Sequence, residues 1–525
     1  MSADAADETD DQVGSLLREA RILLARGNSS AAVSRLGAGL EASPESPQLR
    51  TALADALFEA GDYGAALDSY GRRLDLDPGH VHSLQGLSRC LAQQPSLATK
   101  LRSSDHLITG LVTGSVDPDP FARAAFVRLR QSADLLADPL LLAVLSNALV
   151  TDPVLERMLT EVRRDLCLNS AAPPNELAHA LAAQGQLNEF AWSVSEEESA
   201  MLPRAPKWVR AMYLQDKPDR DLLLRARRLP SLTALAAGNS DDVRSLYEQH
   251  PYPRWQRITL RQQRSLDHYL SRIGPGGQGA ADVPRNPRML VAGCGTGREL
   301  LAAVLAWRPA SVVGFDLSRT SLAYAELMSE RLGVDVELYQ ADLLELGDWD
   351  RRFDVIVCTG VLHHLQDPLA GWRNLRRLLL PTGLMFIGLY SEVARRGIAL
   401  AQEEVRRGGW TATAEGIRAA RESLRSLPAG HPARDCLLLR DFYYSGGCRD
   451  MLFHVQERHF TIPGIDAALQ ELDLEFLDFD VDPATRHLYQ ALFGGRPELE
   501  YWQALEKLYP RTFLGMYQFW CRARS

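Results

Sequence analysis

The sequence predicts an all-α N-terminal part followed by an α/β domain with a doubly wound parallel sheet. Two observations lead to this fold class. Near the start, small residues, glycine and proline recur with a spacing of 34 residues, and after about residue 284 short apolar runs alternate with helical stretches. Such alternation is typical of a parallel sheet with crossover helices on both faces. The 525 residues have room for roughly two to four domains, each with its own core.

The N-terminal repeat is defined by three pairs of residues, each 34 apart: Gly27 and Gly61, Ala32 and Ala66, and Pro44 and Pro78. These positions resemble the tetratricopeptide repeat, in which small residues lie where two helices touch, glycine forms the turn and proline ends the pair. Hairpins of this kind stack because one hairpin alone cannot bury its apolar face. We expect repeats over residues 12–95, ending where the pattern breaks at Pro95. So short an array favours a helical spacer; a surface that binds a protein partner is the alternative.

Residues 105–240 continue the helical pattern and are expected to form a helical linker domain. Loop signals interrupt this stretch at 117–120 and 172–174. Within 153–166, apolar residues recur three and four positions apart, which predicts one buried helix face. No pattern here indicates chemistry, so we interpret the stretch as a scaffold. A lid or lead-in segment is expected at 241–284, and its glycine-rich end at 274–279 predicts a flexible break.

The second domain begins with a strand that ends in glycines. Further apolar runs at 311–315, 334–339, 353–358 and 384–389 predict the next strands, and a ligand of such a sheet lies at their carboxyl ends. The loop after the first strand reads GCGTG over 293–297. A dinucleotide fingerprint would place its third glycine at Arg298, which argues against a nicotinamide-dependent oxidoreductase.

This loop resembles motif I of class I S-adenosylmethionine-dependent methyltransferases, and the elements that follow arrive in that family's order. The second strand ends at Asp316, the third at Asp342, and 353–365 is similar to the fourth strand with its motif. The segment 379–385 resembles the turn before strand five, and 474–481 with 513–522 resembles the closing antiparallel hairpin. The resemblance implies a Rossmann-like methyltransferase domain over 285–525, with a cap insertion at 391–462, and S-adenosyl-L-methionine as the cofactor.

The resemblance also implies the cofactor site. The loop glycines would let the backbone approach the cofactor, Asp316 would accept hydrogen bonds from the ribose hydroxyls, and Asp342 would contact the adenine amino group. Capping of the next helix by Asp316 and a turn role for Asp342 are the alternatives. Cys294 is expected to pack rather than to act as a nucleophile. The full set of expected cofactor contacts is Gly293, Cys294, Gly295, Gly297, Asp316, Leu317, Asp342, Leu343 and Thr359.

The acceptor is expected just beyond the fourth strand, where His363 and His364 lie. A histidine with a pKa near neutrality could take a proton from an oxygen or nitrogen acceptor, although in similar methyltransferases this pair often only packs. Residues 359–362 lack the Asn-Pro-Pro-Tyr signature of amide and adenine amino methylation. No proline-cysteine motif of cytosine C5 methylation follows the strand either.

Two further segments, 247–255 and 441–457, resemble stretches of tetratricopeptide-linked methyltransferases. The first is interpreted either as a lid over the cofactor or as a hydrophobic staple onto the helical domain. The second lies in the cap insertion, where this fold builds its acceptor pocket. Together they supply the candidate pocket residues Tyr252, Arg254, Tyr443, Arg449, His454 and Glu457.

Composition excludes several other classes. A net charge of −9 disfavours bulk nucleic-acid binding, and the absence of any run of about 18 apolar residues disfavours a membrane span. Seven scattered cysteines without a C-x-x-C pair indicate neither a disulfide framework nor a metal site, and they suit a cytoplasmic setting. We therefore predict a cytoplasmic enzyme that methylates an O or N acceptor, either a small molecule or a protein. The alternative is a non-catalytic repeat scaffold with a cofactor-binding pseudo-enzyme domain.

Overall fold

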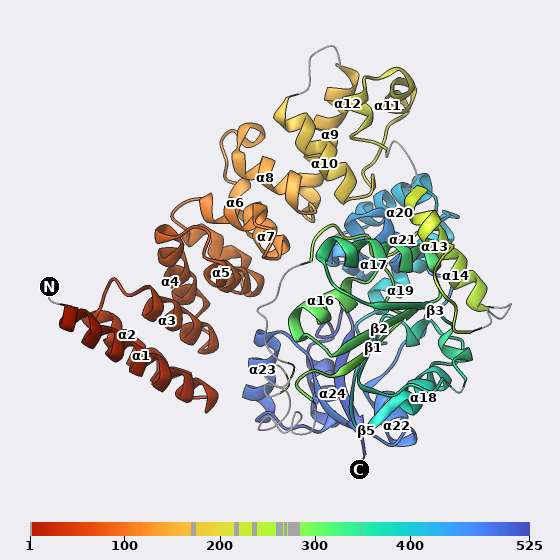
Figure 1. Cartoon of the computed structure of the whole chain (residues 1–525). Coiled ribbons are helices and arrows are strands. Elements are labelled where there is room, and N and C mark those ends of the chain that lie inside the picture. The colour runs from red at the N-terminus through yellow and green to blue at the C-terminus, as the bar shows by residue number, and fades with distance from the viewer. Residues whose placement is uncertain are drawn as a thin grey trace. The chain divides into compact units, whose positions relative to one another are not determined.

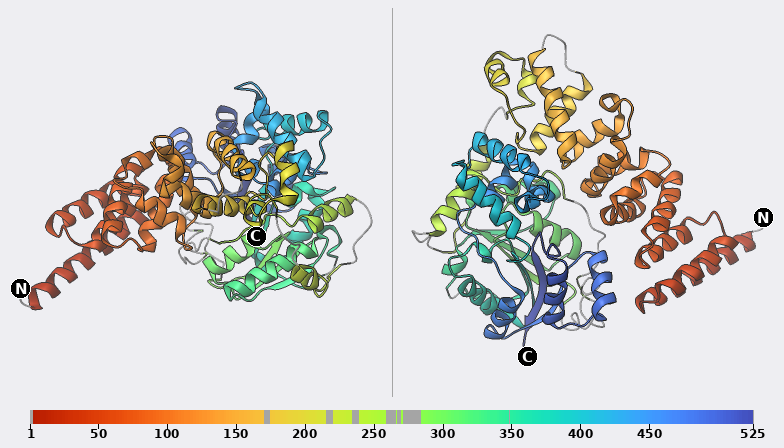
Figure 2. Two further views of the ribbon diagram at one scale, coloured as in Figure 1. Left: turned by 90° about the horizontal axis from the view of Figure 1, so that it is seen from above. Right: turned by 180° about the vertical axis from the view of Figure 1, so that it is seen from behind.

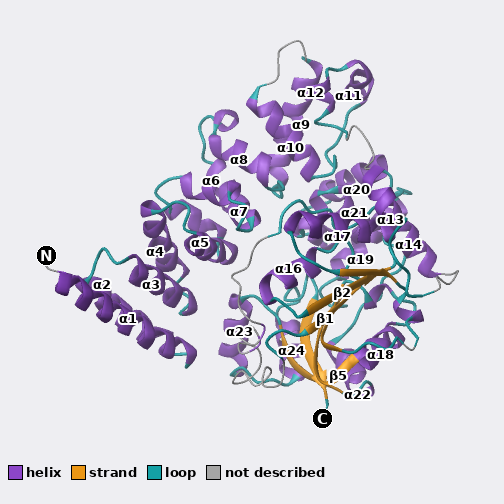
Figure 3. Ribbon diagram, in the orientation of Figure 1, coloured by secondary structure: helices purple, strands orange, loops and turns teal. Residues whose placement is uncertain are grey.

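The structure, a computed structural model, describes residues 3–169, 175–214, 220–233, 239–258, 266, 270, 284–347 and 349–524. The chain divides into two compact units, Met1–Asn188 with Val194–Leu214, and Glu189–Ser193 with Gln215–Ser525. Within the described residues the first unit contains helices only, and the strands gather in the second (Figure 3). The expected breaks at 172–174 and 274–279 lie outside the described residues.

This division differs from the helical linker domain expected at 105–240. Residues up to Leu214 form one unit with the repeats, whereas those from Gln215 on belong with the sheet. The short stretch Glu189–Ser193 also joins the second unit because its carbonyls accept hydrogen bonds from arginines there. Arg418 Nη2 donates to the Phe190 carbonyl oxygen at 2.9 Å, and Arg421 donates to the carbonyl of Ala191. Helical periodicity cannot reveal such a boundary, since both sides of it are helical.

Successive helices of the first unit pack as hairpins, which follow one another along the chain in Figures 1 and 2. The turns use the repeated glycines, since Gly27 and Gly61 adopt φ of +74° and +82°. Each is followed by a residue that caps the next helix, Asn28 or Asp62. The hairpin helices are α1 (Ala3–Ala25), α2 (Ser29–Ala42), α3 (Pro47–Glu59), α4 (Tyr63–Leu76) and α5 (Val81–Gln93).

Small residues allow close packing between these helices, as the repeat pattern predicts. A Cβ on Gly86 of α5 would lie 2.2 Å from the ring of Tyr70 on α4, and Tyr70 is fully buried. The array ends at Pro95, where a 3₁₀ helix begins. The remaining helices of this unit are α6 (Asp105–Val112), α7 (Pro118–Leu129), α8 (Pro139–Asn147), α9 (Pro153–Leu168), α10 (Glu176–Leu187), α11 (Glu196–Met201) and α12 (Lys207–Arg210).

The second unit is built on a seven-stranded sheet of order β3-β2-β1-β4-β5-β7-β6. The first five strands are parallel, and β7 pairs antiparallel with both β5 and β6. The observed bounds start β3 later and β5 earlier than the apolar runs suggested. The strands are β1 (Arg288–Ala292), β2 (Ser311–Asp316), β3 (Glu337–Gln340), β4 (Phe353–Thr359), β5 (Leu379–Leu389), β6 (Leu474–Phe479) and β7 (Tyr517–Ala523).

Each strand contributes alternate residues to two cores, one on each face of the sheet. On β1, Leu290 packs into one core and Val291 into the other. One core includes residues of α18 (Pro368–Leu378), α22 (Ile462–Glu471), α23 (Pro483–Phe493) and α24 (Leu499–Leu508). The other includes residues of α13 (Arg220–Ala226), α16 (Arg298–Trp307) and α17 (Arg319–Leu332).

Two additions to this sheet carry the residues of interest for function. The cap insertion between β5 and α22 folds as α19 (Arg396–Arg407), α20 (Ala414–Ser426), the 3₁₀ helix η8 (Arg440–Tyr443) and α21 (Ser445–Phe453). The described part of the lead-in forms α14 (Asn239–Gln249), which packs on α17. None of the described helices has the length and apolar character that a bilayer crossing would require.

Candidate functional site

The glycine loop joins β1 to α16 at the point where the strand order reverses, between β1 and β4. Gly293, Gly295 and Gly297 all have positive φ, between +52° and +80°. A Cβ at Gly293 would lie 2.2 Å from Val361, and one at Gly297 would lie 2.6 Å from Cβ of Ala325. The loop therefore requires glycine for its backbone conformation and for close packing against neighbouring segments.

Asp316 ends β2 beside this loop. Its carboxylate accepts hydrogen bonds from the backbone N–H groups of Gly295 and Ser318, both at 2.8 Å. Ser318, rather than Asp316, caps α17 through its hydroxyl. Burial raises the pKa of Asp316 to about 6, although the two N–H donors oppose this shift. The structure thus joins the second-strand acid directly to the glycine loop.

Asp342 lies at the end of β3, close to Asp316, whose backbone carbonyl accepts the N–H of Ala341 at 3.0 Å. The Asp342 side chain is 2% exposed and accepts the N–H of Leu344 at 2.9 Å. Its own backbone N–H donates to the Thr233 hydroxyl at 3.0 Å. Asp342 therefore makes the turn contact that the sequence offered as the alternative to an adenine contact. It lies at the strand end where the adenine contact was expected.

The other expected cofactor contacts surround the same strand ends. Leu317 is half-buried, whereas Leu343 packs in the core. The Thr359 hydroxyl at the end of β4 donates to Glu299 on α16. The Cys294 thiol is buried against the sheet, and burial raises its pKa well above the ordinary value, so this thiol is poorly suited to act as a nucleophile.

The lead-in lies against the glycine loop. The Trp255 indole N–H donates to the Thr296 carbonyl at 3.1 Å, and the Thr296 hydroxyl donates to the Pro253 carbonyl. A Cβ on Gly295 would lie 3.0 Å from the carbonyl oxygen of Tyr252. These hydrogen bonds join the lead-in to the loop between β1 and α16.

The two histidines after β4 lie in a stack of buried rings. His363 stacks on Tyr390 at a centroid distance of 3.8 Å, and His364 stacks on His454 at 3.7 Å. The peptide group of Gln456 contacts both members of the second pair. Its carbonyl lies 2.9 Å from His364 Nδ1, and its N–H lies 3.1 Å from His454 Nδ1.

These contacts assign opposite tautomers to the stacked pair. A neutral His364 donates from Nδ1 and so presents a lone pair at Nε2, whereas a neutral His454 carries its proton on Nε2. Burial lowers the pKa of His364 to about 3 and that of His454 to about 4, and it lowers the pKa of His363 as well. All three rings are therefore neutral near pH 7.

An acid–tyrosine cluster, formed by Tyr247, Tyr252, Asp441, Tyr444 and Asp450, lies beside the histidines. The Tyr247 hydroxyl donates to Asp450 at 2.6 Å. Asp441 accepts from Tyr252 at 3.0 Å and from Tyr444 at 2.8 Å, and these two rings stack at 6.3 Å with 10° between their planes. Burial raises the pKa of Asp450 to about 7. The cluster thus places two carboxylates among aromatic faces.

Sequence reasoning singled out only Tyr252 of this cluster. The other four members belong to the two segments, 247–255 and 441–457, that resemble known methyltransferases, and this resemblance was the available signal. Tyr247 and Asp450 are 203 positions apart. No local periodicity connects residues at such a separation, so only the folded chain brings them together.

The remaining candidate pocket residues have different partners. Glu457 forms a buried bidentate pair with Arg395, which also lies 3.6 Å from the centroid of the Tyr390 ring. The Tyr443 hydroxyl donates to the Leu437 carbonyl at 3.0 Å, within the cap. The Arg449 Nε atom donates to the Ala412 carbonyl at 3.2 Å, and Arg254 is exposed. Three of the six candidate pocket residues, Tyr252, His454 and Glu457, therefore belong to the region around His363 and His364. None of the contacts named above joins Tyr443, Arg449 or Arg254 to that region.

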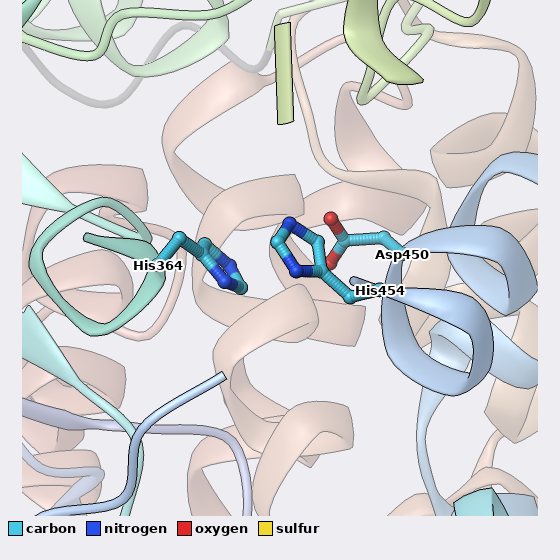
Figure 4. A group of neighbouring side chains, drawn as sticks. All are labelled: His364, Asp450 and His454. Atoms are coloured by element: carbon cyan, nitrogen blue, oxygen red, sulfur yellow. The ribbon is translucent and has the colours of Figure 1, made fainter. Parts of the chain in front are cut away.

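His364, Asp450 and His454 each place a nitrogen or oxygen atom within 4.8 Å of the others. Figure 4 shows His364 facing the two residues that come from the end of α21. The two imidazole planes are only 24° apart at a centroid distance of 3.7 Å. Nitrogen lone pairs lie in the ring plane, so one ion at about 2.1 Å from both nitrogens could not lie in both planes. This arrangement suits hydrogen bonding better than shared metal coordination.

Comparisons with known proteins agree with this architecture. Residues 290–385 match a family described as methyltransferase domain, and residues 17–81 match the tetratricopeptide repeat family. An uncharacterized protein of Synechococcus sp. is 29% identical over 315 residues, which covers 54% of this chain and 70% of that protein. The ubiquinone biosynthesis O-methyltransferase of Alkalilimnicola ehrlichii is 39% identical over 97 residues, covering 18% of this chain and 38% of that enzyme.

The similarity to these O-methyltransferases covers 18% to 22% of this chain. This chain spans less than half the length of each such relative; for the enzyme of Pseudomonas entomophila the covered share is 42%. Among solved structures, PKMT2 from Rickettsia typhi in complex with AdoHcy is 17% identical with a TM-score of 0.40, covering 52% of this chain and 55% of that one.

Proposed function

We propose that this chain, which carries an S-adenosylmethionine-dependent methyltransferase domain behind tetratricopeptide repeats, transfers a methyl group to an oxygen or nitrogen atom of its acceptor. The observation that carries this proposal is the bond between Asp316 and the glycine loop. It places an acid and three positive-φ glycines together at the strand-order reversal of the sheet. Doubly wound sheets bind their ligands at this position.

The residues around the loop fit the cofactor. Asp316 has the buried carboxylate that two ribose hydroxyls require, and its two N–H partners keep it oriented. Gly293, Gly295 and Gly297 add no side chain at three of the five loop positions, and Asp342 lies at the neighbouring strand end. Leu317, Leu343 and Thr359 complete the proposed contacts. When bound, S-adenosylmethionine supplies an activated sulfonium methyl.

The chain itself must align the acceptor and exclude water. The buried histidines and the acid–tyrosine cluster lie beyond the carboxyl ends of β4 and β5, and they offer both proton acceptors and donors. His364 presents an unprotonated Nε2, but burial lowers its pKa to about 3, far from the neutral value that a base at pH 7 needs. The acceptor is a small molecule or a protein. If it is a protein, the tetratricopeptide repeats would bind it. The seven cysteines are free and buried, which is compatible with the reducing cytoplasm that we propose as the setting.

Titration calorimetry with S-adenosylmethionine tests the cofactor site. The variant Asp316→Ala loses its charge-assisted hydrogen bonds to the cofactor, and we expect a total loss of roughly 1.5–3 kcal/mol, which lowers the affinity by about 10- to 150-fold. The matched control is Asp335→Ala, because Asp335 is an exposed acid before β3. Equal affinities for both variants and the original chain would remove Asp316 from the site. No binding to the original chain would reject the proposed function.

A further inference from the structure

We infer that the methyl acceptor is an amine, which binds as a cation between Asp441 and Asp450 of the acid–tyrosine cluster and is methylated on nitrogen. This inference rests on the proposed function and specifies its substrate class. Carboxylates hold an ammonium group by charge and hydrogen bonds, and tyrosine rings attract a cation through their faces. The tyrosine hydroxyls lie at these carboxylates: that of Tyr247 at Asp450, and those of Tyr252 and Tyr444 at Asp441.

Neither Asp441 nor Asp450 forms an ion pair with a basic side chain of the described residues, so a bound cation could pair with them. Tyrosine hydroxyls are the hydrogen-bond partners of Asp441 and Asp450, and no arginine or lysine of the described chain pairs with either carboxylate. The nearby Arg395 pairs with Glu457. Burial raises the pKa of Asp450 and outweighs the effect of Arg395, which favours the charged form of this carboxyl. Arg440 lies 5.3 Å from the centroid of the Tyr444 ring. The three histidines are neutral, so they do not balance the two acids. A buried carboxylate without a counter-charge is costly, and a bound ammonium would remove that cost.

An independent observation also indicates a ligand here. His363 is fully buried, and within the described part of the chain neither of its ring nitrogens has a hydrogen-bond partner; the same holds there for Nε2 of His454. His363 lies against His364 and Tyr390 at ring-centroid distances of 4.3 and 3.8 Å. Buried polar atoms are nearly always paired. A ligand in this region would offer such a partner, and Asp450 itself lies within 4.8 Å of ring nitrogens of His364 and His454.

The cluster lies next to the proposed cofactor site. The Tyr247 hydroxyl donates to Asp450 at 2.6 Å. Burial raises the pKa of Tyr247, and the charges of Asp450 and Asp316 raise it further, so Tyr247 is near enough to the acids of both sites to interact with each. The carbonyl of Tyr252, another member of the cluster, approaches Gly295 in the glycine loop. An amine between Asp441 and Asp450 would therefore lie near the cofactor-binding residues, as in-line transfer requires.

Methyl transfer to the amine begins with the loss of a proton. The ammonium gives one proton to the Asp450 carboxylate and becomes a neutral amine. Its nitrogen lone pair forms the new bond to the methyl carbon while the carbon–sulfur bond breaks and leaves its electron pair on sulfur. The product is a methylated ammonium and a neutral thioether. Burial brings the Asp450 pKa to about 7, which suits a base at neutral pH.

A labelling experiment tests whether the transferred methyl group is bonded to nitrogen or to oxygen. The protein is incubated with labelled S-adenosylmethionine and with lysate from a strain that lacks this protein. The labelled products are treated with hydriodic acid under conditions that release methyl groups from oxygen as volatile methyl iodide but retain those on nitrogen. Retained label supports the amine inference. Volatile label overturns it and leaves the proposed function intact, whereas no labelled product counts against both.

Isosteric variants test the two acids. Asp450→Asn should slow labelling by about 100-fold or more, and Asp441→Asn should raise the lysate concentration needed for half-maximal rate by about 10-fold. Both should bind S-adenosylmethionine within about twofold of the original affinity. The control Asp466→Asn changes an exposed acid on α22. Normal labelling by both cluster variants would overturn the inference, as would equal losses of labelling and cofactor binding.

Discussion

At the scale of single residues, the glycine loop shows that its three glycines are needed for different contacts. The missing Cβ of Gly293 leaves room for Val361, that of Gly297 for Ala325, and that of Gly295 for the lead-in backbone. The sequence pattern identified the positions but assigned all three to cofactor approach. Part of the reason for glycine is packing within the protein, which a motif alone does not reveal.

Gly297→Ala should be much more destabilising than an alanine at another positive-φ glycine. At Gly297 the new Cβ would combine backbone strain with a 2.6 Å contact to Ala325. At Gly333, the C-cap of α17, φ is similarly positive but no atom lies within 4 Å of the new Cβ. We expect a loss of about 3 kcal/mol or more for Gly297→Ala and about 1 kcal/mol for Gly333→Ala. Chemical denaturation measures both; equal losses would show that the contact relaxes freely.

At the scale of elements, the lead-in contacts the sheet unit at two places, the glycine loop and the start of α17. Its aromatic segment contacts the glycine loop, and α14 supplies Glu248 to the start of α17. The Glu248 carboxylate accepts the N–H groups of Arg319 and Thr320, at 2.8 and 3.0 Å, and the Thr320 hydroxyl. A carboxylate at a helix N-terminus pairs with free N–H groups and the positive end of the helix dipole.

Glu248→Ala should therefore loosen the lead-in. The variant leaves two N–H groups of α17 without their side-chain partner, and we expect a loss of about 1–2 kcal/mol in stability. Amide hydrogen exchange should become faster in α14 and in the first turn of α17, and binding of S-adenosylmethionine should weaken. The control is Gln249→Ala, which removes an exposed neighbour whose partner is Ser245 on the same helix. Exchange that is unchanged in Glu248→Ala would show that this contact does not hold the lead-in.

The sequence predicted the elements far better than the contacts between them. Apolar runs predicted the five parallel strands because a buried strand is recognisable from residues adjacent in the chain. The closing hairpin of β6 and β7 was implied by the resemblance. The observed strand ends differ from the predicted ones where pairing with a neighbouring strand sets the boundary. β3 begins at Glu337, and β5 begins at Leu379, which pairs with Phe353. The cofactor half of the site follows a short local motif and was predicted residue by residue. The acid–tyrosine cluster assembles from distant segments, so most of it was not.

At the scale of the whole molecule, the chain consists of two units with separate cores. The repeats bury Ala32, Leu36 and Leu49 among their own helices, whereas the sheet has a core on each face. The expected linker domain at 105–240 differs from this division because the helical pattern continues past Leu214 into α13, which packs on α17. A separate core for each unit implies that each unit can respond separately to a ligand or a core substitution.

Differential scanning calorimetry of the full chain should therefore show two unfolding transitions. S-adenosylmethionine at about 100 times its dissociation constant should stabilise the sheet unit by roughly 2.7 kcal/mol and raise only that transition. Leu36→Ala creates a cavity in the repeat core and should cost about 2–5 kcal/mol, which lowers only the other transition. The matched control Leu76→Ala removes an exposed leucine of the same array and should move neither. A single transition that both the ligand and Leu36→Ala displace would mean that the two units unfold as one.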